Sequence, residues 1–77
     1  MRSGTLALLA PGDRAVVRRI HAEKEFAMRL MELGLTPGTE IALIRRAPFG
    51  DPLELSVRGT HFSIRRSEAE RIHVDAL

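Results

Sequence analysis

Residue types that bind metal ions gather in one short stretch of the chain. His21, Glu23 and Glu25 lie close together, and His21 and Glu25 could share one ion as an i, i+4 pair if a helix began early. Imidazole combined with carboxylate suits zinc or ferrous iron. Two ligands do not complete a site, however, and the solvated start of a helix has the same composition. We therefore predict no metal site and no cofactor, and we keep a sensor domain for a divalent ion such as ferrous iron or zinc as an alternative.

Three pairs of arginines suggest a second kind of chemistry, the binding of phosphate. The pairs lie near the ends of three candidate strands, at Arg18–Arg19, Arg45–Arg46 and Arg65–Arg66. Adjacent residues on a strand point to opposite faces, so the two members of a pair cannot act together. The formal net charge is only +2 and the only aromatics are three Phe, whereas single-strand binders use exposed aromatics for base stacking. We expect no nucleic acid partner, and keep a small barrel that binds RNA or DNA as a further alternative.

The patterns of the common catalytic sites are missing from the sequence. The chain has no Cys, which removes thiolate nucleophiles, disulfides and cysteine-ligated metals together. It contains neither a Gly-x-Ser-x-Gly motif nor a phosphate-binding Gly-x-x-x-x-Gly-Lys-Ser/Thr loop. The aspartates fall in expected turns or in the tail, and His61 and His73, which could still converge across strands, fall in separate elements. We predict that the chain is not an enzyme and has no catalytic residues.

The most pointed feature for binding is the segment Pro48–Pro52. It places Phe49 between two prolines, with Gly50 and Asp51 completing a loop that cannot form regular structure. An aromatic held on a stiff loop loses little entropy on binding, which is the property that protein interfaces use. The alternative is that Phe49 folds back over the end of the domain.

These segments are carried by one small domain, residues 1–77. A chain of 77 residues has room for a single compact core and none for a cleft between lobes. Its hydrophobic share of 44% and charged share of 29% are typical of a soluble protein. No apolar run approaches the ~20 residues of a membrane span, and the early apolar patch is too short for a secretory signal. We expect a cytoplasmic protein without direct membrane insertion.

Hydrophobic periodicity predicts one helix and five short strands. Phe26, Leu30 and Leu33 recur at spacings of four and three, which predicts an amphipathic helix over about residues 23–33, ended by Gly34. Strands are expected at about 14–20, 40–47, 53–58, 61–65 and 72–74. We expect them to form a small, partly open β-barrel because a flat sheet of this length would expose its edges. Its core would contain Leu6, Leu9, Val17, Ile41, Leu43, Leu53, Leu55, Val57, Phe62, Ile64, Ile72 and Val74.

An ordered set of motifs resembles the FeoA family of ferrous iron transport proteins. The matching segments are Arg29-Leu30-x-x-Leu33-Gly34-Leu35-x-Pro37-Gly38-Thr39, Arg46–Pro52, Val57-Arg58-Gly59 and Ile64-Arg65-Arg66-x-Glu68-Ala69-x-x-Ile72-x-Val74. Together with the opening leucines they span nearly the whole chain. The resemblance implies a mainly β, SH3-like five-stranded barrel with one inserted helix. It also implies a cytoplasmic, non-enzymatic accessory of the FeoB membrane transporter, and it offers no catalytic residues to carry over.

The resemblance and the loop together lead to one hypothesis about function. We expect a regulatory protein of ferrous iron uptake that acts by contact with a FeoB-like transporter. The expected partner-binding residues are the loop and the exposed side of the predicted helix: Pro48, Phe49, Gly50, Asp51, Pro52, Arg29 and Glu32. The oligomeric state and the direction of any regulation stay open.

Overall fold

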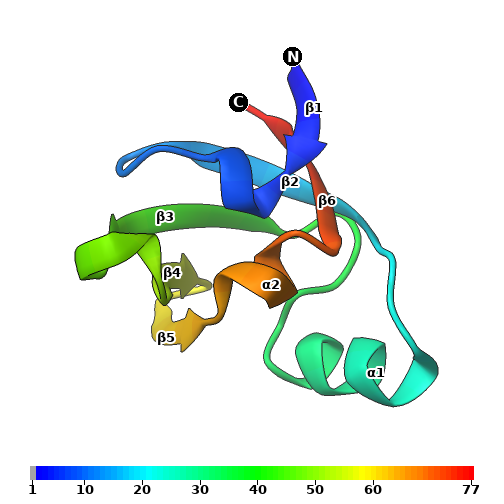
Figure 1. The fold of residues 1–77 in the computed structure, drawn as a ribbon. Helices are drawn as coiled ribbons and strands as arrows, with labels where there is room; N and C mark the ends of the chain where they lie inside the picture. Colours follow the sequence, from blue (N-terminus) through cyan, green and yellow to red (C-terminus); the bar gives the residue numbers. More distant parts are fainter. Residues whose placement is uncertain (1) are drawn as a thin grey trace.

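The computed structural model describes residues 2–77 and consists mainly of one strongly curved antiparallel sheet (Figure 1). Its six strands are β1 (Arg2–Thr5), β2 (Arg14–Ile20), β3 (Glu40–Arg46), β4 (Leu53–Val57), β5 (Thr60–Ile64) and β6 (Ile72–Ala76). Their order across the sheet is β1-β6-β2-β3-β4-β5, so β1 and β5 form the two edges. Two helices, α1 (Lys24–Glu32) and α2 (Arg66–Ala69), and two short 3-10 turns, η1 (Leu6–Leu8) and η2 (Pro48–Gly50), complete the fold.

The strands follow from the alternation of side chains. In β4 the three inward residues Leu53, Leu55 and Val57 are buried, and the residues between them are half-buried. All five predicted strands are present, and the mainly β architecture with one inserted helix is confirmed. The sixth strand, β1, was not predicted because its residues show no apolar alternation. It is held by backbone pairing with β6, with Thr5 opposite His73.

One continuous core lies inside the curve of the sheet. The predicted core residues are buried with one exception, Phe62, which is only half-buried on the edge strand β5. The core also contains residues that the periodicity did not single out, namely Ala7, Ala15, Leu35 and Ala69. Burial of these apolar side chains supplies the main stabilisation of so small a domain.

Helix α1 lies to one side of the sheet and is inserted between β2 and β3 (Figure 1). Leu30 faces the core at 2% exposure and Phe26 is half-buried, as the helical period predicts. Leu33 was expected on the same face, but it is 45% exposed. It is the C-cap residue, where the chain leaves the helix, and the fully buried Leu35 takes the inward position instead.

The turn that ends α1 is a Schellman motif. The N–H of Leu35 donates to the carbonyl of Leu30 at 3.1 Å, and the N–H of Gly34 donates to that of Met31 at 2.9 Å. Gly34 has a φ of 100° here, a conformation that costs other residues about 1–2 kcal/mol. A Cβ at Gly34 would also lie 3.3 Å from Cγ1 of Val57 in β4. The turn therefore fixes how α1 leaves the sheet.

Helix α2 is a single turn, and one residue, Arg65, separates it from the end of β5. The segment Ser67–Glu70 has the Ser-x-x-Glu form of a capping box. The structure has a different register, because the N-cap is Arg65 and its backbone N–H donates to the carboxylate of Glu68 at 2.8 Å. The buried Ala69 decides the register, since it must face the core.

Candidate docking surface

The loop from Pro48 to Pro52 holds its own shape through backbone hydrogen bonds. The N–H of Gly50 donates to the carbonyl of Ala47 at 2.8 Å, and the N–H of Ala47 donates to the carbonyl of Pro52 at 3.0 Å. Phe49, at the tip, has a φ of 71° and a fully exposed ring. The alternative in which Phe49 folds back over the domain is therefore wrong.

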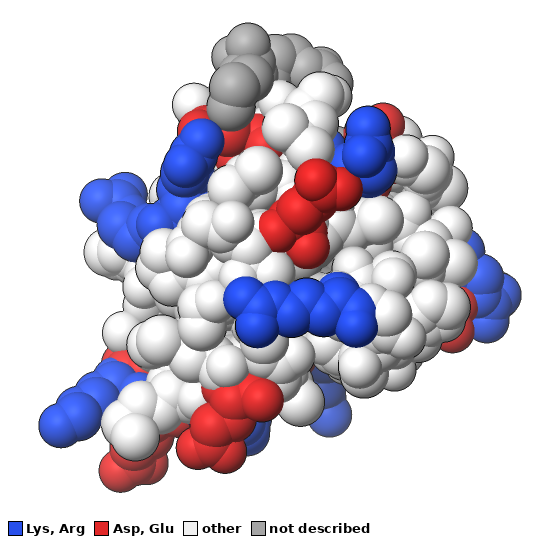
Figure 2. All heavy atoms as spheres, turned by 180° about the vertical axis from the view of Figure 1, so that it is seen from behind, with Lys and Arg blue, Asp and Glu red and all other residues white. Residues whose placement is uncertain are grey.

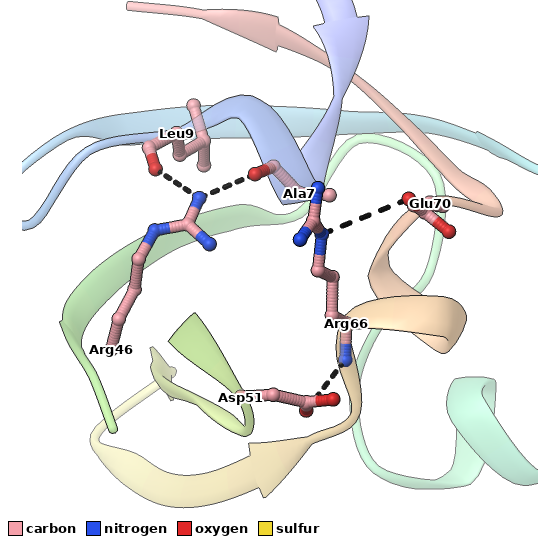
Figure 3. Close-up of polar contacts among 6 residues, drawn as sticks. All are labelled: Ala7, Leu9, Arg46, Asp51, Arg66 and Glu70. Carbon is pink, nitrogen blue, oxygen red and sulfur yellow. Dashed lines mark hydrogen bonds and ion pairs between the residues drawn. The ribbon is translucent and has the colours of Figure 1, made fainter. Parts of the chain in front are cut away.

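Asp51 ties this loop to α2. Its Oδ1 accepts a hydrogen bond from the backbone N–H of Arg66, the first residue of α2, at 3.0 Å (Figure 3). The side chain of Arg66 lies 3.8 Å from the Glu70 carboxylate, one turn further along. The carboxylate of Asp51 thus links two segments that are adjacent in space and separated by two strands in sequence.

The base of the loop is held from the opposite side by Arg46, the last residue of β3. Its Nη2 donates to the backbone carbonyls of Ala7 and Leu9, the latter at 2.7 Å (Figure 3). Arg46 is half-buried, so these bonds are less screened by water than those of a surface arginine. Its guanidinium therefore serves the fold and is not free to bind phosphate.

Helix α1 meets α2 through Arg29. The guanidinium of Arg29 lies over the ring of Phe26, 5.2 Å from its centroid, and Nη2 lies 3.2 Å from the carboxylate of Glu68. Because Glu68 belongs to α2 and Asp51 also contacts α2, the loop and α1 lie on either side of this short helix (Figure 1). The predicted docking residues thus fall into two patches joined by α2.

The outer side of α1 carries two exposed methionines. Met31 is 40% exposed and Met28 is 48% exposed. Met31 and Glu32, which is also exposed, lie three and four residues after Met28, so both neighbour Met28 on the helix surface. Methionine adapts its shape to a partner surface, so this face suits protein contact better than charge alone would.

The arginine pairs do not form a basic rim. Arg45 pairs with Glu54 across the β3–β4 ladder, and Arg18 pairs with Asp75 at 2.5 Å. Basic and acidic side chains are interspersed over the face shown in Figure 2. Hydrogen bonds from Arg18 and then from Ser3 hold the pKa of the Asp75 carboxyl below its usual value of 3.8. Such a surface gives little attraction to a polyanion.

The i, i+4 arrangement of His21 and Glu25 that was considered as an alternative is not formed, because α1 begins at Lys24 and leaves His21 outside the helix. Within residues 2–77, no three His, Asp or Glu side chains converge as a metal-binding group. His61 and His73 lie on strands that are not neighbours in the sheet. The structure brings His21 and His73 together instead, with ring centroids 6.3 Å apart.

No helix in the part of the chain described here has the length and apolar character needed to cross a bilayer.

Comparison with known families and proteins adds independent findings. The model of the FeoA domain family matches residues 4–76. A Porphyromonas gingivalis protein described as an Fe(2+) transport protein A/Fe(2+) transporter FeoB fusion protein is 32% identical over 72 residues. The matched region covers 94% of this chain and 8% of that relative, so the chain corresponds to a small part of the fusion protein.

Two solved structures with the same architecture are of proteins described as FeoA. The solution NMR structure of FeoA protein from Chlorobium tepidum is 44% identical with a TM-score of 0.89, covering 95% of this chain and 70% of that one. The crystal structure of Stenotrophomonas maltophilia FeoA complexed with zinc, described as an SH3 domain protein, is 40% identical with a TM-score of 0.80. That match covers 92% of this chain and 88% of the other. The expected SH3-like fold class is confirmed, with a sheet that stays open between its edge strands.

Proposed function

The chain belongs to the FeoA family, which is linked to ferrous iron transport, and on this basis we propose that it is a cytoplasmic, non-enzymatic accessory protein of ferrous iron uptake. It acts by direct contact with a FeoB-type membrane transporter. Its docking surface is the Pro48–Pro52 loop together with the exposed side of α1 around Arg29 and Glu32.

The observation that carries this proposal is the state of Phe49. Its ring is fully exposed, and its backbone adopts a positive φ that L-residues avoid at a cost of about 1–2 kcal/mol. The ring makes no compensating burial within the domain. A strained residue that gains nothing from its own fold is explained by a contact with something else.

The surroundings of Phe49 support the same function. The loop is fixed by its own backbone bonds and by Asp51, so little conformational freedom is lost when a partner closes over the ring. On the far side of α2, Met28 and Met31 extend the apolar surface along α1. The fusion of a related chain to a FeoB transporter in one protein supports that transporter as the partner.

Binding of Phe49 variants to a purified FeoB-type transporter tests the proposal. Phe49→Asn is the sharpest change, because Asn tolerates a positive φ and removes the ring. We expect its free energy of unfolding to be unchanged or higher, while the affinity falls by about tenfold or more, as for a buried aromatic anchor. Leu77→Ala, which trims another exposed apolar side chain at the end of the chain, is the matched control and should keep full affinity.

A double variant of the loop decides whether the loop has been assigned correctly. Phe49→Asn and Asp51→Ala combined in one folded protein should impair iron uptake in cells that depend on the transporter. Normal uptake and normal transporter binding by this double variant would refute the loop as the docking surface. Binding that is lost only when Met28 or Met31 is changed would move the surface to α1.

A further inference from the structure

His21 and His73 form a pair that the docking surface does not use. Their ring centroids are 6.3 Å apart and their planes are nearly perpendicular, at 85°. His21 directly follows β2, and His73 lies in β6, the strand beside it. The two residues are 52 positions apart in sequence, as their numbers show, so sheet topology alone creates the pair.

The backbone holds both histidines in place. The N–H of His21 donates to the carbonyl of Arg71 at 2.7 Å, which fastens the end of β2 to the start of β6. His73 is paired on both sides, with Arg19 in β2 and with Thr5 in β1. The His21 side chain is exposed and that of His73 is half-buried, so one ring is free to turn while the other is confined.

We propose that His21 and His73 together bind one divalent transition-metal ion through their imidazole nitrogens, with water completing the coordination. Two nitrogens each about 2.1 Å from one ion place their ring centroids roughly 5–6.5 Å apart. The observed separation of 6.3 Å lies within that interval, so the two rings are close enough to share one ion. Imidazole ligands favour zinc, and divalent iron binds the same set more weakly.

The charges around the pair set a limit on its affinity. Arg19 is the register partner of His73 and places a guanidinium on the same part of the sheet. The nearest carboxylate along β6, Asp75, is already held by Arg18 and Ser3 and is not free to serve as a third ligand. The site is therefore a weak, exchangeable one, which the cation of Arg19 weakens further.

Zinc titration of the untagged chain tests the proposal. Binding is measured by calorimetry and by the shifts of the imidazole signals in NMR spectra. We expect one zinc ion per chain, with shifts confined to His21 and His73. His21→Ala and His73→Ala should each weaken binding by about tenfold or more, since changes even to outer-shell partners of a metal cost 10–100-fold. His61→Ala is the matched control, because His61 is an exposed histidine on the distant edge strand β5, and it should leave binding unchanged.

A second variant separates metal binding from a structural effect. Arg19→Gln removes the competing cation without touching either ligand, so it should bind zinc more tightly than the original chain. The proposal fails if the His21→Ala/His73→Ala double variant, shown to be folded by circular dichroism, binds zinc as well as the original chain. It fails equally if zinc shifts the signals of His61 instead, or if the original chain shows no saturable binding.

Discussion

The carboxylate of Asp51 accepts a hydrogen bond from the backbone N–H of Arg66 at 3.0 Å, and this bond couples the loop that presents Phe49 to helix α2. The contact is exposed, so its contribution to stability is modest. Its importance lies in its position, because α2 also contacts α1: the side chain of Arg29 in α1 donates a hydrogen bond to the carboxylate of Glu68 in α2. One short helix thus sets the distance between both halves of the proposed docking surface.

Replacing Asp51 should loosen the loop more than it destabilises the fold. For Asp51→Ala we expect the free energy of unfolding to fall by about 0.5–1 kcal/mol, the usual worth of one exposed hydrogen bond. Amide exchange at Arg66 should accelerate, because its N–H loses its acceptor. Asp51→Asn keeps an acceptor oxygen and is the control that should stay close to the original chain. Unchanged exchange in Asp51→Ala would show that the bond does not hold the loop.

Gly34 and Gly38 lie between α1 and β3. Substitutions at these two glycines distinguish the cost of backbone strain from the cost of a packing clash. Gly34 and Gly38 have φ values of 100° and 91°, but only at Gly34 would a Cβ approach a neighbour, Val57. Gly38→Ala should lower the free energy of unfolding by about 1–2 kcal/mol, the cost of the left-handed conformation alone. Gly34→Ala should cost more than Gly38→Ala, because the 3.3 Å contact must also be relieved. Urea denaturation of both variants measures the difference. Equal losses of unfolding free energy would show that the contact with Val57 adds no cost at Gly34.

The strands could be predicted because their side chains alternate. Leu53, Leu55 and Val57 are buried at every second position of β4, and a pattern of this kind depends only on the local sequence. The strand β1 has no such pattern. It exists because β6 offers it a row of backbone partners, and pairing between segments 70 residues apart leaves no local trace in the sequence.

Less of the candidate sites could be predicted, because they too depend on contacts between segments that are distant in the sequence. Two prolines and a glycine predicted an irregular loop, but the sequence also allowed Phe49 to fold back over the domain, and only the structure shows that its ring is exposed. The approach of His21 to His73 depends on the register between β2 and β6, which shifts at a bulge between Val17 and Arg19. A one-residue change in register moves a side chain to the opposite face, so this pair could not be inferred from spacing.

Arg45 and Arg46 are neighbours in sequence and should respond very differently to substitution. Arg46 donates to two backbone carbonyls from a half-buried position, whereas Arg45 pairs with Glu54 in solvent. Arg46→Gln should lower the free energy of unfolding by about 1.5–3 kcal/mol, the range for hydrogen bonds made by charged groups. Arg45→Gln should cost about 0–1 kcal/mol, as exposed ion pairs do. Thermal unfolding compares the two, and a larger loss for Arg45→Gln would overturn the assignment of Arg46 as the residue that anchors the loop.

Asp75 should make the fold sensitive to strong acid. Hydrogen bonds from Arg18 and Ser3 hold its pKa below the usual 3.8, so its carboxyl stays charged in the folded chain at pH values where it is protonated in the unfolded chain. A lowered carboxyl pKa contributes stability that is fully present above the unfolded pKa and is lost as the pH falls through the folded pKa. The loss due to Asp75 is therefore expected below about pH 4, with no effect between pH 5 and 8.

NMR titration of the Asp75 carboxyl measures the pKa directly. Arg18→Gln should raise it toward the usual value, and Asp75→Asn should flatten the stability profile below pH 4. An unchanged pKa in Arg18→Gln would show that the Arg18 contact does not hold the charge.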